Sequence, residues 1–290
     1  MLRLLAANKF VFAHSSTSMS TAALISLRET FEASLVVCVM LAFLEHSQRR
    51  NYIPALWAGV GAGIIFSIVL AWLMNTYAAS LGDEAKEVYE GIMMFAAAGL
   101  LLWMIGWMAM SGRTMKAHIE KNMAAHIAGG SALGIFFLSF TSTAREGAEM
   151  TILIHATLLS SSNVHTLAGV GIGIVIAIGI ASLMLRGVRL IPIHTFFKVT
   201  GILLFILGTG LTMHGIGEFH EAGSITLLSM QAWDSNWLLA DDTLIASIAK
   251  IVVGYEATPS VLQIFGGSLY ALIAIMTWKM SRGSEKKIAA

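Results

Sequence analysis

Seven apolar runs, each about long enough to cross a bilayer, divide this chain. Only helices and closed barrels satisfy their backbone polar groups in the hydrocarbon core. Hydrophobic residues make up 57% of the 290 residues and charged residues 12%, about half the charge of a soluble domain. The sequence therefore predicts an all-α polytopic membrane protein with seven transmembrane helices, near residues 22–44, 54–76, 91–110, 131–159, 166–185, 199–219 and 260–279.

Basic residues are distributed unequally between the two sets of connecting segments. Lys and Arg follow the first, third, fifth and seventh runs, as at Arg49, Arg113, Arg189 and Lys287, whereas the other set holds mainly acids. Because basic residues collect on the cytoplasmic side, we expect a multi-pass protein of the cell membrane with its N-terminus outside and its C-terminus cytoplasmic. The net charge of +1 argues against nucleic acid as a partner, and Cys38 is the only cysteine, which excludes an intrachain disulfide.

A sequence repeat divides the predicted transmembrane domain, residues 21–280, into two halves. Residues 58–64 (AGVGAGI) in the second run match residues 168–174 (AGVGIGI) in the fifth. Each half, about 21–110 and 131–221, holds three predicted helices, so the second half is expected to be inverted in the membrane. Inverted repeats with a binding site near the bilayer midplane are typical of secondary transporters. The remaining segments are an outer N-terminal tail (1–20), an outer loop (222–259) with a predicted interfacial helix (242–254), the seventh helix (260–279) and a cytoplasmic tail (281–290).

The same charged motif, Arg-Glu-x-x-Glu, lies inside the first and the fourth apolar runs. In each copy both glutamates fall on one helix face with the arginine. Charges at this depth are costly and mark functional sites, and glutamate oxygens suit hard cations such as iron, manganese or magnesium. The six side chains carry a formal charge of −2, which a divalent ion would neutralise. The sequence thus predicts an intramembrane metal site with the ligands Glu29, Glu32, Glu146 and Glu149 and the charge-pairing residues Arg28 and Arg145. The alternative is that the motif only holds the two helices together by ion pairs.

Both copies of the motif lie about 15 Å from the outer ends of their runs, close to the midplane of a ~30 Å hydrocarbon core. Charges at this depth should face the protein interior rather than lipid. We therefore expect the first and fourth helices to pack antiparallel with their motif faces opposed. The four carboxylates would then converge on one cavity, where a single cation could bridge both helices.

A second set of candidate ligands lies at the outer end of the sixth run. His214, Glu218 and Glu221 follow i, i+4, i+7 spacing, and Glu90 opens the third run. We interpret these residues as a site where a cation enters, and an ordinary solvated helix end is the alternative. The 17 methionines, Met104 among them, are interpreted as apolar gap-fillers rather than copper(I) ligands.

Catalytic motifs are missing from the sequence. There is no Ser-His-Asp order, no phosphate-binding glycine loop and no His-Glu-x-x-His. The Glu-x-x-His motif of helical di-iron carboxylate proteins is missing as well. We therefore expect a transporter and not an enzyme, with a membrane carboxylate-metal oxidoreductase as the competing hypothesis.

At these residues the chain resembles the high-affinity iron permease family, which includes the fungal ferric permease and the bacterial EfeU-type permeases. The resemblance covers nearly the whole chain from about Met19 onward. It rests on the two Arg-Glu-x-x-Glu motifs and on Glu90-Gly91, Glu221-Ala222-Gly223 and Gly254-Tyr255 before Pro259. The pair Thr30-Phe31 departs from the Gly-Leu that the family more often has between the charged residues, and it leaves the ligands intact.

This resemblance implies import of iron, ferric or ferrous, with the motif glutamates as ligands and no permanently bound cofactor. It also implies an extracytoplasmic partner in addition to iron ions and membrane lipid. In fungi that partner is a multicopper ferroxidase, and in bacteria it is a periplasmic iron-binding or haem-peroxidase protein. Within transport, a permease for another divalent metal such as manganese or lead is the alternative.

Overall fold

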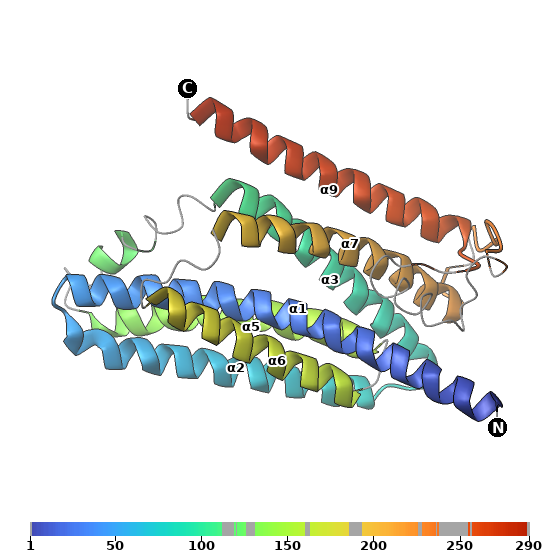
Figure 1. Cartoon of the computed structure of the whole chain (residues 1–290), viewed down its shortest axis with the longest axis horizontal. Helices are drawn as coiled ribbons and strands as arrows, with labels where there is room; N and C mark the ends of the chain where they lie inside the picture. The colour runs from blue at the N-terminus through green and yellow to red at the C-terminus, as the bar shows by residue number, and fades with distance from the viewer. Residues whose placement is uncertain are drawn as a thin grey trace.

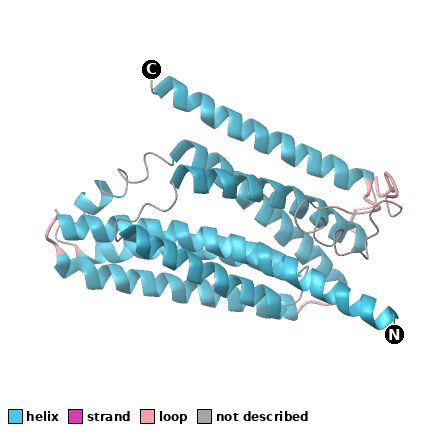
Figure 2. Ribbon diagram, in the orientation of Figure 1, coloured by secondary structure: helices cyan, strands magenta, loops and turns pink. Residues whose placement is uncertain are grey.

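The computed structural model describes residues 2–111, 119, 121–125, 131–159, 163–185, 193–225, 228–235, 237, 255 and 257–288. Within these residues the regular structure is helical, and Figure 2 shows no strand among them. The elements are α1 (Leu2–His46), the short 3-10 helix η1 (Arg50–Tyr52), α2 (Ile53–Ala79), α3 (Asp83–Ser111), α5 (Ala132–Leu159), α6 (Asn163–Leu185), α7 (Ile193–Glu221) and α9 (Val261–Ile288).

Five of these helices, α2, α3, α6, α7 and α9, are long and apolar enough to cross a membrane. The helices α1 and α5 are long as well, but each carries the three ionisable side chains of the repeated motif inside its apolar run. Within the described residues, an all-helical architecture with several membrane-length helices is therefore confirmed. Several helices extend beyond the expected boundaries: α1 begins at Leu2 and so includes the predicted tail, α3 begins at Asp83, α7 begins at Ile193, and α9 continues to Ile288. The predicted interfacial helix over 242–254 lies outside the described residues.

Local sequence explains where several helices begin and end. Pro54 lies in the first turn of α2, where the missing backbone N–H costs no hydrogen bond. Asp83 and Glu84 lie in the first turn of α3, where the helix dipole favours acids. Gly223 follows α7 with a φ of 66°, and its N–H donates to the carbonyl of His220 at 3.1 Å. This left-handed residue ends the helix, as glycine commonly does.

The helices form a group of four, a neighbouring pair and one outer helix. Figure 1 shows α1, α2, α5 and α6 lying together, with α3 and α7 beside them and α9 on the far side of that pair. The most extensive helix contacts are α1 with α6, α2 with α5, and α3 with α7. The helices α1 and α5 also contact each other, and Figure 1 shows them running in opposite directions. The expected antiparallel neighbourhood of the two motif helices is therefore confirmed.

Small residues bring α2 and α6 close to their partners in a reciprocal way. A methyl group added at Gly63 of α2 would overlap Thr143 of α5, and one added at Gly173 of α6 would overlap Ser26 of α1. Because glycine lets helix backbones approach closely, these contacts place α2 tightly on one motif helix and α6 tightly on the other. Each motif helix is thereby covered by the glycine-bearing helix of the other half of the sequence.

Candidate metal site

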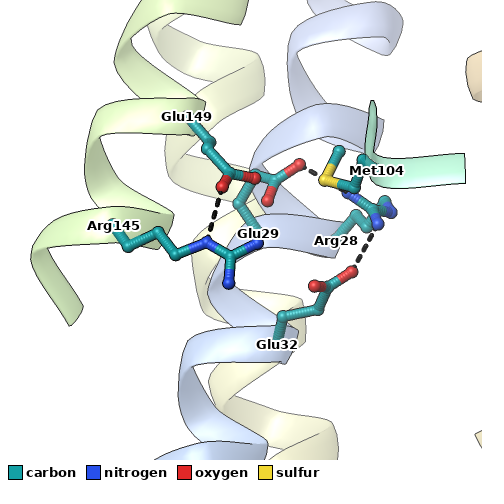
Figure 3. Close-up of polar contacts among 6 residues, drawn as sticks. All are labelled: Arg28, Glu29, Glu32, Met104, Arg145 and Glu149. Atoms are coloured by element: carbon teal, nitrogen blue, oxygen red, sulfur yellow. Dashed lines mark hydrogen bonds and ion pairs between the residues drawn. The ribbon is translucent and has the colours of Figure 1, made fainter. Parts of the chain in front are cut away.

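The first copy of the motif forms a closed ion-pair group on α1. Arg28, Glu29 and Glu32 have side chains that are 0%, 1% and 4% exposed. The Nη1 atom of Arg28 donates to Glu29 Oε1 at 2.7 Å, and its Nη2 atom pairs with Glu32 Oε1 at 2.5 Å (Figure 3). One guanidinium thus holds two carboxylates of its own helix, because residues i, i+1 and i+4 lie on one side of a helix.

The second copy of the motif, on α5, is arranged differently. Arg145 Nε donates to Glu149 Oε1 at 2.9 Å, the same i, i+4 pairing as on α1 (Figure 3). The Arg145 side chain is 42% exposed, however, whereas Arg28 is fully buried. Glu146 is buried, and its Oε2 atom has no hydrogen-bond partner. The two sequence copies are therefore alike in spacing and unlike in burial.

Carboxylates from the two helices meet between α1 and α5. One oxygen each of Glu29, Glu32 and Glu146 lies within 4.8 Å of the others. Oxygens bound to one hard cation at about 2.0–2.6 Å lie roughly 4–5 Å apart when they face each other across the ion. The observed spacing therefore suits a single cation after small side-chain adjustments. Among the described residues, no other set of three or more His, Cys, Asp or Glu residues meets this spacing.

The fourth predicted ligand, Glu149, is not a member of this close group. Its carboxylate is held by Arg145. Glu29 and Glu146 each keep one buried oxygen, Oε2, that no hydrogen bond satisfies. A buried carboxylate oxygen without a partner is costly, and a cation between the helices would satisfy both.

Met104 of α3 contacts the motif although no pattern in the sequence indicates this contact. Its Sδ atom accepts a hydrogen bond from Arg28 Nη1 at 2.7 Å (Figure 3). The sequence favours an apolar gap-filling role for Met104, and this residue does belong to a buried apolar cluster. No sequence signal points to the contact with Arg28, because the two residues lie 76 positions apart.

A cavity of about 540 Å³ lies beside the carboxylates, between α1, α2, α5 and α6. Glu29, Glu146 and Thr143 line one part of it. The Oγ1 atom of Thr143 is buried and has no hydrogen-bond partner. The carboxylate group is therefore not sealed within the helix bundle but borders a space large enough for several water molecules.

The residues predicted to admit a cation do not form a comparable group. Glu90 pairs with Lys86 at 3.7 Å, and His214 Nδ1 lies 3.0 Å from the carbonyl oxygen of Gly210 on its own helix. In the described part of the chain, no group of three ligands with the spacing of the three glutamates includes Glu90, His214, Glu218 or Glu221. Their role as an entrance stays a prediction.

Membrane-length helices and a carboxylate–arginine group buried between two of them define a polytopic membrane protein. The chain belongs to the iron permease FTR1 family, which matches residues 19–280. Members of this family are permeases, so the protein is a transporter and not an enzyme, as the sequence predicts.

Curated relatives agree with this assignment. The chain is 26% identical over 259 residues to the "Ferrous iron permease EfeU" of Shigella sonnei (strain Ss046), covering 89% of this chain and 94% of the relative. The protein of the same name from Escherichia coli O157:H7 matches equally. The one from Yersinia pestis is 26% identical over 255 residues, 87% of this chain and 90% of the relative. No solved structure matches this chain significantly.

Proposed function

We propose that this protein imports iron through the intramembrane site formed by Glu29, Glu32 and Glu146. The observation that carries the proposal is the convergence of three buried carboxylates from two antiparallel helices, two of them with an unsatisfied oxygen. Glu149 is the fourth ligand in this proposal, and it reaches the ion when its pair with Arg145 opens. Family membership and the names of the relatives support iron as the transported substrate.

The charge of the site favours a divalent ion. Four glutamates and two arginines carry a formal charge of −2, which Fe²⁺ neutralises and Fe³⁺ exceeds by one. The relatives' printed name, ferrous iron permease, supports the same oxidation state. Carboxylate oxygens also accept Mn²⁺, so discrimination against manganese needs a direct test.

We further propose that the protein consists of two inverted three-helix repeats, α1–α3 and α5–α7, followed by α9 as a seventh span. The reciprocal packing supports this proposal, since α1 packs on α6 as α5 packs on α2. The equivalent close approaches at Gly63 and Gly173 support it as well. In this arrangement the metal site lies between the first helices of the two repeats, as in other transporters built from inverted repeats.

The proposed orientation places the N-terminus outside and the C-terminus in the cytoplasm. The excess of Lys and Arg in alternate connecting segments supports it. An extracytoplasmic oxidase or iron-binding protein that delivers the ion is the proposed partner, on the strength of the family resemblance. The ion would then enter from the side on which α1 begins.

Radioactive iron uptake into proteoliposomes tests the proposed site. Glu29→Gln, Glu32→Gln and Glu146→Gln keep the side-chain shape but remove an anionic ligand. Each should reduce anoxic Fe²⁺ uptake by about tenfold or more, since even residues that only support metal ligands commonly cost that much. Glu45→Gln is the matched control, because Glu45 lies at the end of α1 with a side chain that is 59% exposed.

Near-normal uptake by the double variant Glu29→Gln/Glu146→Gln would contradict the metal site and support the alternative, in which the motif serves only helix packing. Competition by Mn²⁺ in the same assay separates iron from manganese transport. Complete suppression of iron uptake by equimolar Mn²⁺ would favour the manganese alternative.

A further inference from the structure

The cavity beside the carboxylates reaches farthest along α1, on the side where that helix ends. Along α1 its lining runs from Glu29 to Leu41, a rise of about 18 Å toward the end of that helix. Along α5, which runs the opposite way, the lining ends at Thr151, about 7 Å beyond Glu146. The cavity therefore leads from the carboxylates toward the side of the membrane on which α1 ends.

Polar groups lie both beside the carboxylates and along the α1 wall of this cavity. Beside the carboxylates lie the unsatisfied oxygens of Glu29, Glu146 and Thr143, all buried. Along the wall, Thr30, Ser34 and Cys38 are spaced by four residues, so that their side chains lie in one line on α1. Buried polar atoms without protein partners are normally satisfied by water or by an ion.

The size and the remaining lining of the cavity suit passage rather than tight binding. Six water molecules take up roughly 180 Å³ at about 30 Å³ each, so a volume of about 540 Å³ accommodates a hydrated cation. The opposite walls, from α2 and α6, are mainly aliphatic, as at Ile64 and Ile178. Conduction requires that an ion leave its site again, and a wall with few ligands does not retain it.

We propose that this cavity is a water-filled passage through which a hydrated divalent cation moves between the carboxylate site and the membrane side on which α1 ends. This inference rests on the proposed transport function, and it adds the route of the ion and the lining residues to that function. In the proposed orientation the passage leads from the carboxylates toward the cytoplasm.

The single native cysteine makes the passage directly testable. Methanethiosulfonates react with thiolates, which form only where water reaches the sulfur. A membrane-impermeant cationic methanethiosulfonate should therefore modify Cys38 in the otherwise unchanged protein when it is added on the side where α1 ends. Mass spectrometry of the purified protein measures the extent of modification with time, in inverted and in right-side-out vesicles.

Two neighbouring isoleucines of α6 provide a matched comparison in a Cys38→Ser background. Ile178 is 51% exposed and lines the cavity, whereas Ile176 is 45% exposed and does not. Ile178→Cys should react about tenfold faster or more than Ile176→Cys, because lipid excludes the charged reagent from the latter. Anoxic Fe²⁺ should slow the modification of Cys38, and Glu146→Gln should remove that protection.

The outcomes separate the passage from the transport function. Slow modification of both Cys38 and Ile178→Cys, or equal rates at the two α6 positions, would overturn the water-filled passage and indicate a cavity filled by lipid. Modification only from the side where α1 begins would overturn its direction. Fast, selective modification without protection by Fe²⁺ would support the passage but contradict its link to the glutamate site.

Discussion

The contrast between the two motif arginines predicts a large difference in their contribution to stability. Arg28 is fully buried and holds Glu29 and Glu32 at 2.7 and 2.5 Å. Arg28→Leu fills the position with an apolar side chain. It leaves two buried carboxylates without the guanidinium that pairs with them, beside the carboxylate of Glu146. Removing one partner of a buried ion pair typically costs about 3–5 kcal/mol. We expect a loss of that size in the free energy of unfolding.

Arg145 provides the comparison within the same protein. Its side chain is 42% exposed and pairs with Glu149 at 2.9 Å (Figure 3). Partly exposed pairs contribute about 0–1 kcal/mol, so Arg145→Leu should destabilise the protein far less than Arg28→Leu. Unfolding by SDS titration in mixed micelles, followed by the fluorescence of the 7 tryptophans, measures both values.

A further variant distinguishes two causes of the expected loss of stability, namely unpaired buried charge and lost packing. The triple variant Arg28→Leu/Glu29→Gln/Glu32→Gln removes the two carboxylates that the single variant leaves unpaired. Replacing a whole buried ionic group often restores stability, so this variant should recover most of the loss. Equal stability of Arg28→Leu and Arg145→Leu, or a triple variant no more stable than the single one, would refute the electrostatic explanation.

Two further predictions concern packing and orientation. Gly59→Ala should destabilise the protein by about 1–3 kcal/mol in the same titration, because the added methyl group overlaps Ser139. Gly61→Ala should be nearly neutral, since nothing lies within 4 Å of its added methyl group. Equal effects of the two substitutions would contradict the close packing of α2 on α5. In a cysteine-free background, Ser235→Cys should react with a membrane-impermeant thiol reagent added outside the cell, and Ser111→Cys should not. Reaction of Ser111→Cys from outside would contradict the predicted orientation.

Several features of this structure can be predicted from the sequence because lipid leaves few alternatives. Charges inside an apolar run must face protein, so two such runs predict that α1 and α5 are neighbours. The structure confirms this contact and also the i, i+4 pairs from Arg28 to Glu32 and from Arg145 to Glu149.

Other features depend on contacts between distant segments and could not be predicted. Two identical motifs give no sign that one arginine is buried and the other is 42% exposed. That difference depends on what covers each motif, and Arg28 is covered in part by Met104 of α3. The cavity likewise depends on how α2 and α6 lie against α1 and α5, and no local pattern in the sequence specifies that spacing.

The reciprocal packing of α1 on α6 and of α2 on α5 has a consequence for how the chain is assembled in the cell. Translation delivers α1 and α2 to the bilayer before α5, which begins at Ala132, has been synthesised. During this interval the carboxylates of α1 have no partner helix, and the guanidinium of Arg28 on the same helix compensates one of their two negative charges. The local ion pairs thus lower the cost of inserting α1 before the other half arrives.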